Sequence, residues 1–369
     1  MSLIQYLSRI QFDFGAIAGL ADELDALGLK RPLLITDKGI EASRILERVL
    51  DAAKPHQPVL YTGTTENPTE GSLKECLQLW EEHGCDGLIA LGGGSPLDLG
   101  KAVALLATHG GQLADYDVKT GGSARIGKVA PQIAIPTAAG TGAEVGRACV
   151  MTLETGRKCV AVNLNMVADT IIADPELTLS LPPKLTAATG IDALSHSVET
   201  YLSPSVNPPA DAIALDGLSR SARWLRVAVE EGTNRKARWE MMMASLEGGM
   251  VLQKGLGAAH AMATPLGEKH HHHGTLIGIL LPHVVSFNAS ETPDRIATLA
   301  QIAGTDDPLD EWLRRLVSDI GLPGGLASLG ENGNDFTEIA TKANADHLTL
   351  TNPRPVSIED YEKLLKAAM

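Results

Sequence analysis

The 369-residue sequence has a net charge of −14 and an isoelectric point near 5.2. Binding to nucleic acids or to anionic membranes depends on basic patches, so this acidic balance argues against both. Hydrophobic residues make up 44% of the chain, as in ordinary globular proteins. The length suits two domains of roughly 150–200 residues, each with its own core.

The four cysteines form no CxxC pair. The first residues lack the basic and then apolar pattern of a signal peptide. No uninterrupted apolar stretch approaches the roughly 18 residues that a membrane-spanning helix needs. We therefore expect a cytoplasmic protein.

Short apolar runs alternate with helical patterns in the first half of the chain. The predicted helices include 72–83 and 97–108. The predicted strands lie at 32–37, 58–63, 86–91, 132–137, 158–162 and 170–174. This alternation is typical of βαβ units around a mostly parallel sheet.

After the proline-bracketed stretch at 174–183, strand-like runs essentially stop. The remaining pattern predicts helices at 184–202, 209–231 and 235–253, followed by shorter ones. We therefore predict an α/β domain over residues 1–181 and an all-helical domain over residues 182–369.

A glycine-rich turn, GGGS at 92–95, follows the predicted strand at 86–91 and leads into a helix that carries Asp98 and Lys101. Glycines let the backbone approach a ligand, and the first turn of a helix offers free N–H groups to a phosphate. Structural turns of this kind are also common, so this turn alone does not establish a cofactor site.

A second turn, PTAAGTGAE at 136–144, follows the predicted strand at 132–137. Two such turns at the carboxyl ends of strands in one α/β domain indicate a dinucleotide-binding site. Asp37 ends the predicted strand at 32–37, where a carboxylate can accept hydrogen bonds from a ribose and repel a 2′-phosphate. The same position also suits a simple helix N-cap.

Asp192 and His196 lie four residues apart in a predicted helix and therefore on one face. The spacing suits two ligands of one cation, although an isolated pair is more often a hydrogen bond on a helix surface. His260 lies among small residues, and His273 follows 13 residues later. One carboxylate and three imidazoles suit a divalent ion such as iron or zinc.

These motifs together resemble the iron-containing (group III) alcohol dehydrogenase family. The matching segments, in chain order, are GGGS at 92–95 with Asp98 and Lys101, PTAAGTGAE at 136–144, DPELT at 174–178, GIDALSH at 190–196, and GLGAAHAM with the later His-Gly within 255–274. They lie across nearly the whole chain and in the expected order.

The resemblance implies an α/β dinucleotide-binding domain, an all-α domain and a catalytic metal in the cleft between them. It implies NAD as the cofactor, with NADP as an alternative, iron as the metal, with zinc as an alternative, and a homo-oligomer such as a dimer. Carried over by position, the metal ligands are Asp192, His196, His260 and His273. The implied cofactor-binding residues are Asp37, Asn67, Gly93, Gly94, Ser95, Asp98, Thr137, Thr141 and Lys158.

One position departs from the family pattern. Relatives commonly carry a second histidine four residues after the first, near the nicotinamide, and here that position is Thr264. A threonine does not titrate near neutral pH, so it cannot replace a histidine as an acid or base. We expect either that the Thr264 hydroxyl relays the proton or that a histidine at 270–272, His270 first, takes this role.

The sequence therefore predicts a metal-dependent, NAD(P)-linked oxidoreductase that interconverts a primary alcohol and an aldehyde. The expected mechanism is hydride transfer, with the metal as a Lewis acid on the substrate oxygen. Two alternatives remain open. One is a related metal- and NAD-dependent enzyme of the dehydroquinate synthase or glycerol-1-phosphate dehydrogenase type, and the other is a catalytically altered binding protein.

Overall fold

The computed structural model describes residues 4, 6 and 8–369. The absence of a signal peptide was predicted partly from residues 1–3, 5 and 7, which lie outside the described residues. The chain divides into two compact units. An α/β unit contains Tyr6–Ala138 and Ala143–Thr178, whereas a helical unit contains Leu179–Met369 and the short segment Ala139–Gly142. The predicted domain boundary at residue 181 lies just after Thr178.

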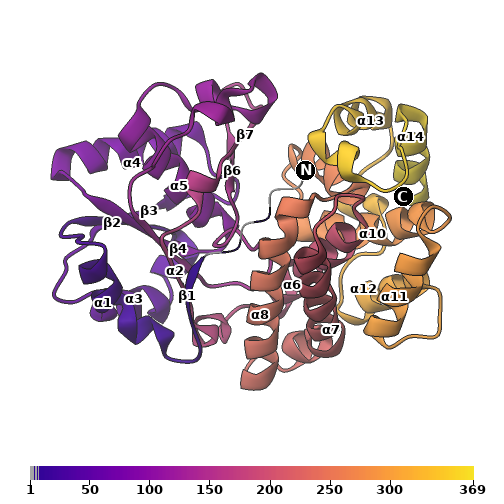
Figure 1. Ribbon diagram of the computed structural model, residues 1–369, viewed down its shortest axis with the longest axis horizontal. Helices are drawn as coiled ribbons and strands as arrows, with labels where there is room; N and C mark the ends of the chain where they lie inside the picture. Colours follow the sequence, from indigo (N-terminus) through magenta and orange to yellow (C-terminus); the bar gives the residue numbers. More distant parts are fainter. Residues whose placement is uncertain (1–3, 5, 7) are drawn as a thin grey trace. The chain divides into compact units, whose positions relative to one another are not determined.

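The α/β unit is built on a six-stranded sheet in which all the paired strands run parallel (Figure 1). The order across the sheet is β1-β8-β5-β4-β2-β3. These strands are β1 (Arg9–Phe12), β2 (Pro32–Asp37), β3 (Val59–Thr64), β4 (Gly87–Gly92), β5 (Gln132–Pro136) and β8 (Thr170–Ala173). The predicted fold class, a parallel α/β domain followed by a helical domain, is confirmed.

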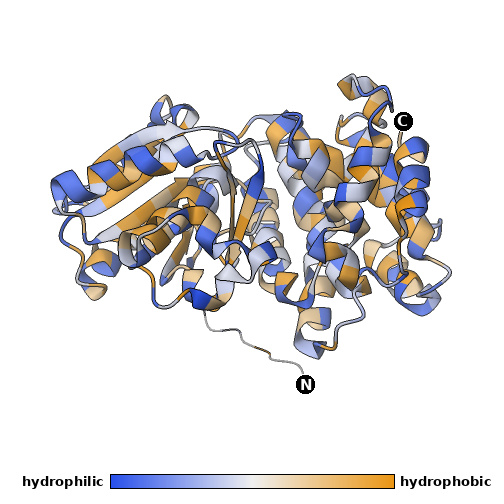
Figure 2. Ribbon diagram, turned by 90° about the horizontal axis from the view of Figure 1, so that it is seen from above, coloured by the Kyte–Doolittle hydropathy of each residue, from blue (hydrophilic) through white to orange (hydrophobic). Residues whose placement is uncertain are grey.

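Helices cover both faces of this sheet (Figure 1). Successive side chains of a strand point to opposite faces, so Leu33 packs toward α4 and α5, whereas Leu34 packs toward α1 and α3. Both faces are therefore apolar, and the central strands are coloured as hydrophobic almost throughout in Figure 2. The helices of this unit are α1 (Leu20–Ala26), α2 (Lys38–Glu41), α3 (Arg44–Ala52), α4 (Glu70–His83) and α5 (Gly94–His109).

The strand order reverses direction between β2 and β4, which are neighbours in the sheet. From β2 the chain continues to β3 on one side, and from β4 it continues to β5 on the other. Open α/β sheets bind ligands at the carboxyl ends of the strands that flank such a reversal. The fold therefore directs attention to Asp37, at the end of β2, and to the glycine turn after β4.

Two features of this unit differ from the predicted elements. The predicted strand at 158–162 exists as β7 (Lys158–Val162), but it pairs antiparallel with β6 (Ala148–Thr152) in a separate two-stranded ribbon rather than joining the parallel sheet. β6 and β1 were not predicted at all. Each has only four or five residues and alternates between more and less buried positions, so neither forms a continuous apolar run.

The second unit consists of α-helices joined by turns and by longer connections, some of which contain short 3-10 helices. Its largest contacts join α6 to α7 and α7 to α8, and α10 packs on α6, α9 and α12. Among the residues that the structure describes, no helix is both long and apolar enough to cross a membrane. The helices are α6 (Pro183–Leu202), α7 (Pro208–Glu230), α8 (Arg235–Val251), α9 (Ala258–Gly267), α10 (His273–Asn288), α11 (Pro293–Ala303), α12 (Leu309–Asp319), α13 (Phe336–Asn344) and α14 (Ile358–Ala367).

The carboxylate of Glu23 fixes the short strand β1 to the rest of the sheet. Glu23 lies on α1 and is only 4% exposed. It accepts hydrogen bonds from Arg9 and Gln11 of β1 at 2.8–2.9 Å and from Thr170 of β8 at 3.0 Å. The hydrogen bond from Arg9 lowers the pKa of Glu23 from 4.5 to about 2.

We predict that Glu23→Gln destabilises the protein in a pH-dependent way. A depressed folded-state pKa contributes stability above the unfolded value of 4.5, and this stability is lost as the pH falls toward 2. Because Arg9 is largely exposed, we discount the full linkage and expect a loss of roughly 2 kcal/mol at pH 7. Urea unfolding of both proteins should show this difference shrinking by about half or more at pH 3. A difference that does not change with pH would show that the charge of Glu23 is not the cause.

Candidate active site

The helical unit brings one carboxylate and three imidazoles around a common point. The Nε2 atoms of His196, His260 and His273 lie 3.6, 3.5 and 3.6 Å from Asp192 Oδ1. The rings of His196 and His260 are stacked, with centroids 5.0 Å apart. The structure thus brings together all four predicted metal ligands.

The geometry of this group fits a divalent cation. Four ligand atoms at about 2.1 Å from a tetrahedral metal lie about 3.4 Å from one another, close to the three separations from Asp192 Oδ1. Asp192 Oδ1 and His260 Nε2 are buried and have no hydrogen-bond partner among the described residues. Buried polar atoms without partners are costly, and a bound cation would satisfy both. Asp192, His260 and His273 each place one ligand atom within 4.8 Å of the other two, and His196 is not in this mutually close group.

Helix packing makes this convergence possible. Asp192 and His196 share one face of α6 because they are four residues apart. His273 begins α10, and the next residue, Gly274, packs directly on the backbone of α6. A Cβ at position 274 would lie 1.9 Å from the carbonyl oxygen of Ala188, so only glycine lets α10 approach closely enough.

A second glycine, Gly248 on α8, lets α8 pack closely against α6. A Cβ at Gly248 would lie 3.1 Å from the carbonyl oxygen of Ala193 and 3.2 Å from Cβ of His196. Any larger side chain at this position would press on the imidazole-bearing residue. The sequence interpretation missed Gly248, because nothing in the local sequence shows which helix it faces.

Glu199 is a further residue of this group that the sequence interpretation missed. It lies on α6 and is 3% exposed, and its Oε2 is 2.5 Å from Nδ1 of His260. The sequence could have indicated this, because residues 192, 196 and 199 follow the i, i+4, i+7 spacing that places side chains on one face of a helix. Burial disfavours a charged imidazole, but Glu199 and Asp192 outweigh it and raise the pKa of His260 to about 9.

The pKa values of the other two imidazoles, His196 and His273, are lowered rather than raised. Burial lowers the pKa of His196 to about 4, which favours the neutral form that ligates metals. The partial burial of His273 lowers its pKa in the same direction. Burial alone would raise the pKa of Asp192, but the neighbouring imidazoles hold it well below its usual range. The side chain of His273 is 45% exposed, compared with 5% for His196 and 6% for His260. The group is therefore closed around α6 and α9 and more open at His273.

The two residues predicted to move a proton lie near this group in the sequence. Thr264 is on α9, one turn after His260, and its hydroxyl donates to the His260 carbonyl oxygen at 3.1 Å. His270 is exposed, and it is the one described non-glycine residue with a positive φ, 66°. His271 instead contacts Glu331 at 2.7 Å.

Several predicted cofactor residues lie at the carboxyl ends of β2 and β4. Gly93 is the N-cap of α5, and an added Cβ there would meet no atom within 4 Å. The backbone at Gly93 is therefore accessible, and Gly94 begins the helix. Asp37 lies beside this turn, since its Oδ2 would be 3.4 Å from a Cβ on Gly92. Its Oδ1 accepts from the Ile40 N–H at 2.9 Å, so Asp37 is an N-cap, one of the two roles considered from the sequence.

Other predicted cofactor residues are connected to one another. Lys158 on β7 donates to Oδ1 of Asn67 at 2.7 Å. The hydroxyl of Ser95 donates to the carbonyl oxygen of Glu66, next to Asn67. Burial raises the pKa of Asp98 to about 6, and this carboxylate accepts from the Val150 N–H of β6 at 3.0 Å. The β6–β7 ribbon therefore joins the glycine turn to the polar segment around residue 67.

The second predicted turn has two parts with different roles. Thr137 donates its N–H to the carbonyl oxygen of Gly92 at 3.0 Å and so joins the two turns. Thr141 lies in the segment Ala139–Gly142, which belongs to the helical unit. Added Cβ atoms at Gly140 and Gly142 would lie 2.5 Å from Thr189 and 2.4 Å from Gly249, so these two glycines are required by packing against α6 and α8.

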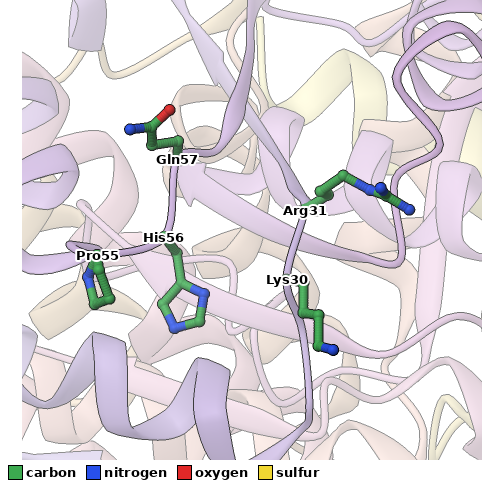
Figure 3. Close-up of a pocket in the computed structure, with 5 residues that line it drawn as sticks. All are labelled: Lys30, Arg31, Pro55, His56 and Gln57. Atoms are coloured by element: carbon green, nitrogen blue, oxygen red, sulfur yellow. The ribbon is translucent and has the colours of Figure 1, made fainter.

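Figure 3 shows a surface hollow of about 410 Å³ in the α/β unit. It is lined by Lys30, Arg31, Pro55, His56 and Gln57, which precede β2 and β3. These are the amino ends of parallel strands, whereas ligands of such sheets bind at the carboxyl ends. We therefore do not assign the hollow to the cofactor.

Comparison with known proteins identifies the family. The profile described as iron-containing alcohol dehydrogenase matches residues 8–175, and the C-terminal profile of the Fe-containing alcohol dehydrogenase family matches residues 186–369. The chain belongs to the iron-containing alcohol dehydrogenase family. It is accordingly an oxidoreductase of alcohols and aldehydes, and the predicted family is confirmed.

Members of this family with known functions resemble the whole chain. The 4-hydroxybutyrate dehydrogenase of Cupriavidus necator is 42% identical and covers 100% of both chains. The 1,3-propanediol dehydrogenase of Citrobacter freundii is 36% identical over 97% of this chain and 96% of its own.

Solved structures of the family agree with this fold. A 1,3-propanediol oxidoreductase superposes with a TM-score of 0.93 at 33% identity and full coverage of both chains. A sulfoacetaldehyde reductase from Bifidobacterium kashiwanohense, solved in complex with NAD⁺, has a TM-score of 0.91 at 28% identity, covering 100% of this chain and 99% of its own. The predicted iron and NAD agree with the family and with this complex.

We predict that Gly274→Ala disrupts the metal-binding group, whereas Gly267→Ala does not. The added methyl at 274 would overlap the Ala188 carbonyl oxygen, so α10 must move away from α6 and carry His273 with it. We expect a loss of roughly 3 kcal/mol in the free energy of unfolding and little zinc uptake. A Cβ at Gly267 meets no atom within 4 Å, so its variant should stay within about 1 kcal/mol of the parent. Denaturant unfolding and chelator competition measure both; equal behaviour of the two variants would contradict the packing argument.

Proposed function

We propose that this enzyme uses a bound divalent metal and NAD to interconvert a primary alcohol and its aldehyde, with 4-hydroxybutyrate as the leading substrate candidate. The observation that carries the proposal is the approach of three imidazole Nε2 atoms to within 3.5–3.6 Å of Asp192 Oδ1. The substrate is suggested by the 42% identical 4-hydroxybutyrate dehydrogenase, whose length this chain covers completely. The diol 1,3-propanediol is the second candidate, because dehydrogenases of that name are up to 36% identical.

The metal ligands proposed are Asp192, His196, His260 and His273, with iron as the metal and zinc as the alternative. When bound, such an ion supplies Lewis-acid polarisation of the substrate oxygen. These residues would hold it in a largely buried group, where Asp192 contributes a negative charge and His196 and His273 contribute neutral imidazoles. The more exposed His273 leaves one direction open for the substrate.

The cofactor proposed is NAD, held by the turn at 92–95 and the residues around it. Asp37 supports NAD over NADP, because a carboxylate beside the glycine turn accepts hydrogen bonds from a ribose and repels a 2′-phosphate. Gly93, Gly94, Ser95, Asp98, Thr137, Thr141, Asn67 and Lys158 remain the other proposed cofactor residues. A hydride passes between the substrate carbon and the nicotinamide, and oxidation of the alcohol releases one proton. We also propose that the enzyme is a cytoplasmic homo-oligomer, such as a dimer.

For the proton we propose His270, with Thr264 as a supporting residue. An imidazole titrates near neutral pH, whereas a hydroxyl does not. The Thr264 hydroxyl already donates to the helix through the His260 carbonyl oxygen. Its remaining capacity is to accept a hydrogen bond, so it can orient a neighbouring group without supplying a proton.

We predict that metal-stripped protein regains NAD-dependent oxidation of 4-hydroxybutyrate when Fe²⁺ or Zn²⁺ is returned. His196→Ala should lower both metal affinity and kcat by at least about 100-fold, because it removes a buried ligand. Absorbance at 340 nm with 4-hydroxybutyrate, 1,3-propanediol and simple alcohols, each with NAD⁺ or NADP⁺, measures activity. His347→Ala is the matched control, since His347 is half exposed and contacts Asp346 instead. Turnover that needs no metal, or a preference for NADP⁺, would contradict the corresponding part of the proposal.

We predict that His270→Ala and Thr264→Val differ in their effect on turnover. Losing a general acid–base group typically costs about 100-fold or more in rate, so His270→Ala should lower kcat strongly. Thr264→Val should leave kcat within about threefold, because its hydroxyl is engaged within the helix. Steady-state kinetics from pH 6 to 10 separate the two. If Thr264→Val lowered kcat more than His270→Ala, proton transfer would depend on the Thr264 hydroxyl instead.

A further inference from the structure

The carboxylate of Glu199 contacts two groups of α9 at once. Its Oε2 is 2.5 Å from Nδ1 of His260, and its Oε1 accepts from the Ala259 N–H at 2.9 Å. Glu199 therefore receives a hydrogen bond from the ring and another from the first turn of the helix that carries the ring. Both of its oxygens are used, and the residue is 3% exposed.

This contact decides which nitrogen of His260 faces the metal-binding group. When Nδ1 donates its proton to Glu199, Nε2 carries the lone pair, and Nε2 is the atom that lies 3.5 Å from Asp192 Oδ1. By contrast, Nδ1 of His196 is buried and has no hydrogen-bond partner among the described residues. The orientation of His260 is thus fixed by a partner that His196 lacks.

The chain is arranged to admit this carboxylate. The N-cap of α9 is Gly257, which has no side chain to cap the helix. A Cβ at that position would lie 2.9 Å from Glu199 Oε1 and 2.8 Å from Asn352 Oδ1. Asn352 in turn accepts from the Ala258 N–H at 3.2 Å, so two side chains from outside the helix replace the missing cap.

We propose that Glu199 is a positioning residue that orients His260 and so raises the affinity of the enzyme for its metal. Because Glu199 lies on α6 with Asp192 and His196, one helix sets three parts of the metal site: two ligands directly and a third through its partner. The proposal rests on the metal site proposed above. It assigns to Glu199 a role in addition to capping α9, and the two roles can be separated by experiment.

The test measures Zn²⁺ affinity of the full-length, metal-stripped protein by chelator competition. Partners of metal-ligating histidines typically contribute 10–100-fold to affinity. We therefore expect Glu199→Ala to weaken Zn²⁺ binding about 100-fold and Glu199→Gln about 10-fold, since glutamine keeps one acceptor oxygen and loses the other. With Co²⁺ as a probe, the visible absorption bands should shift in both variants.

Asn352→Ala is the matched control, because it removes the other external cap of α9 without touching the His260 ring. It should lower the thermal stability of the metal-free protein to a similar extent as Glu199→Ala but leave Zn²⁺ affinity within about twofold. If Glu199→Ala and Asn352→Ala lost Zn²⁺ affinity equally, Glu199 would act only as a cap of α9, and the proposal would be overturned. An unchanged affinity in Glu199→Ala would also overturn it.

A double-mutant cycle distinguishes this proposal from the metal site itself. In a His260→Ala background, Glu199→Ala should weaken Zn²⁺ binding no further, because its target ring is gone. If His196→Ala leaves Zn²⁺ affinity intact, the proposed metal site is wrong. If His196→Ala weakens binding and Glu199→Ala does not, only the positioning role fails.

Discussion

The buried carboxylate of Asp192 is the constraint on which the helical unit depends. A charge that is 2% exposed is expensive unless opposite charge or several hydrogen bonds surround it. The neutral nitrogens of His196 and His273 supply neither when they face the carboxylate with lone pairs. A cation at the common point resolves the conflict, because it attracts the carboxylate and the lone pairs together. A bound metal would also satisfy Asp192 Oδ1 and His260 Nε2, which have no hydrogen-bond partner among the described residues.

That requirement explains several glycines in helices where glycine costs stability. A glycine in a helix interior loses roughly 1 kcal/mol relative to alanine. Gly274 and Gly248 permit backbone approaches to α6 that a methyl group would block or crowd. These approaches set the positions from which His273 and His196 reach Asp192. The lower helix propensity of these two glycines is therefore offset by the close helix packing that brings His273 and His196 to Asp192.

Local patterns predicted most of the elements but not their partners. The strands at 32–37 and 158–162 have the predicted bounds. The second was expected in the parallel sheet because its antiparallel partner, β6, was not recognised in the sequence. Likewise, spacing within α6 placed Asp192 and His196 on one face, whereas the distances to His260 and His273 depend on packing between helices. The cap on Asp37 was foreseeable from its place after a strand. Glu199 was not recognised because a glutamate in a helix usually faces solvent.

Position 264 shows that the contacts orienting the His260 ring do not involve a titratable side chain one turn later. Thr264 follows His260 by one helical turn, and its hydroxyl is satisfied by the His260 carbonyl oxygen. A threonine there leaves α9 intact and leaves the His260 ring on Glu199. The ligand geometry consequently tolerates the loss of a titratable side chain at this turn, because none of the contacts that orient the ring passes through it. Proton movement can then be reassigned to the histidines before α10 without changing how the metal is held.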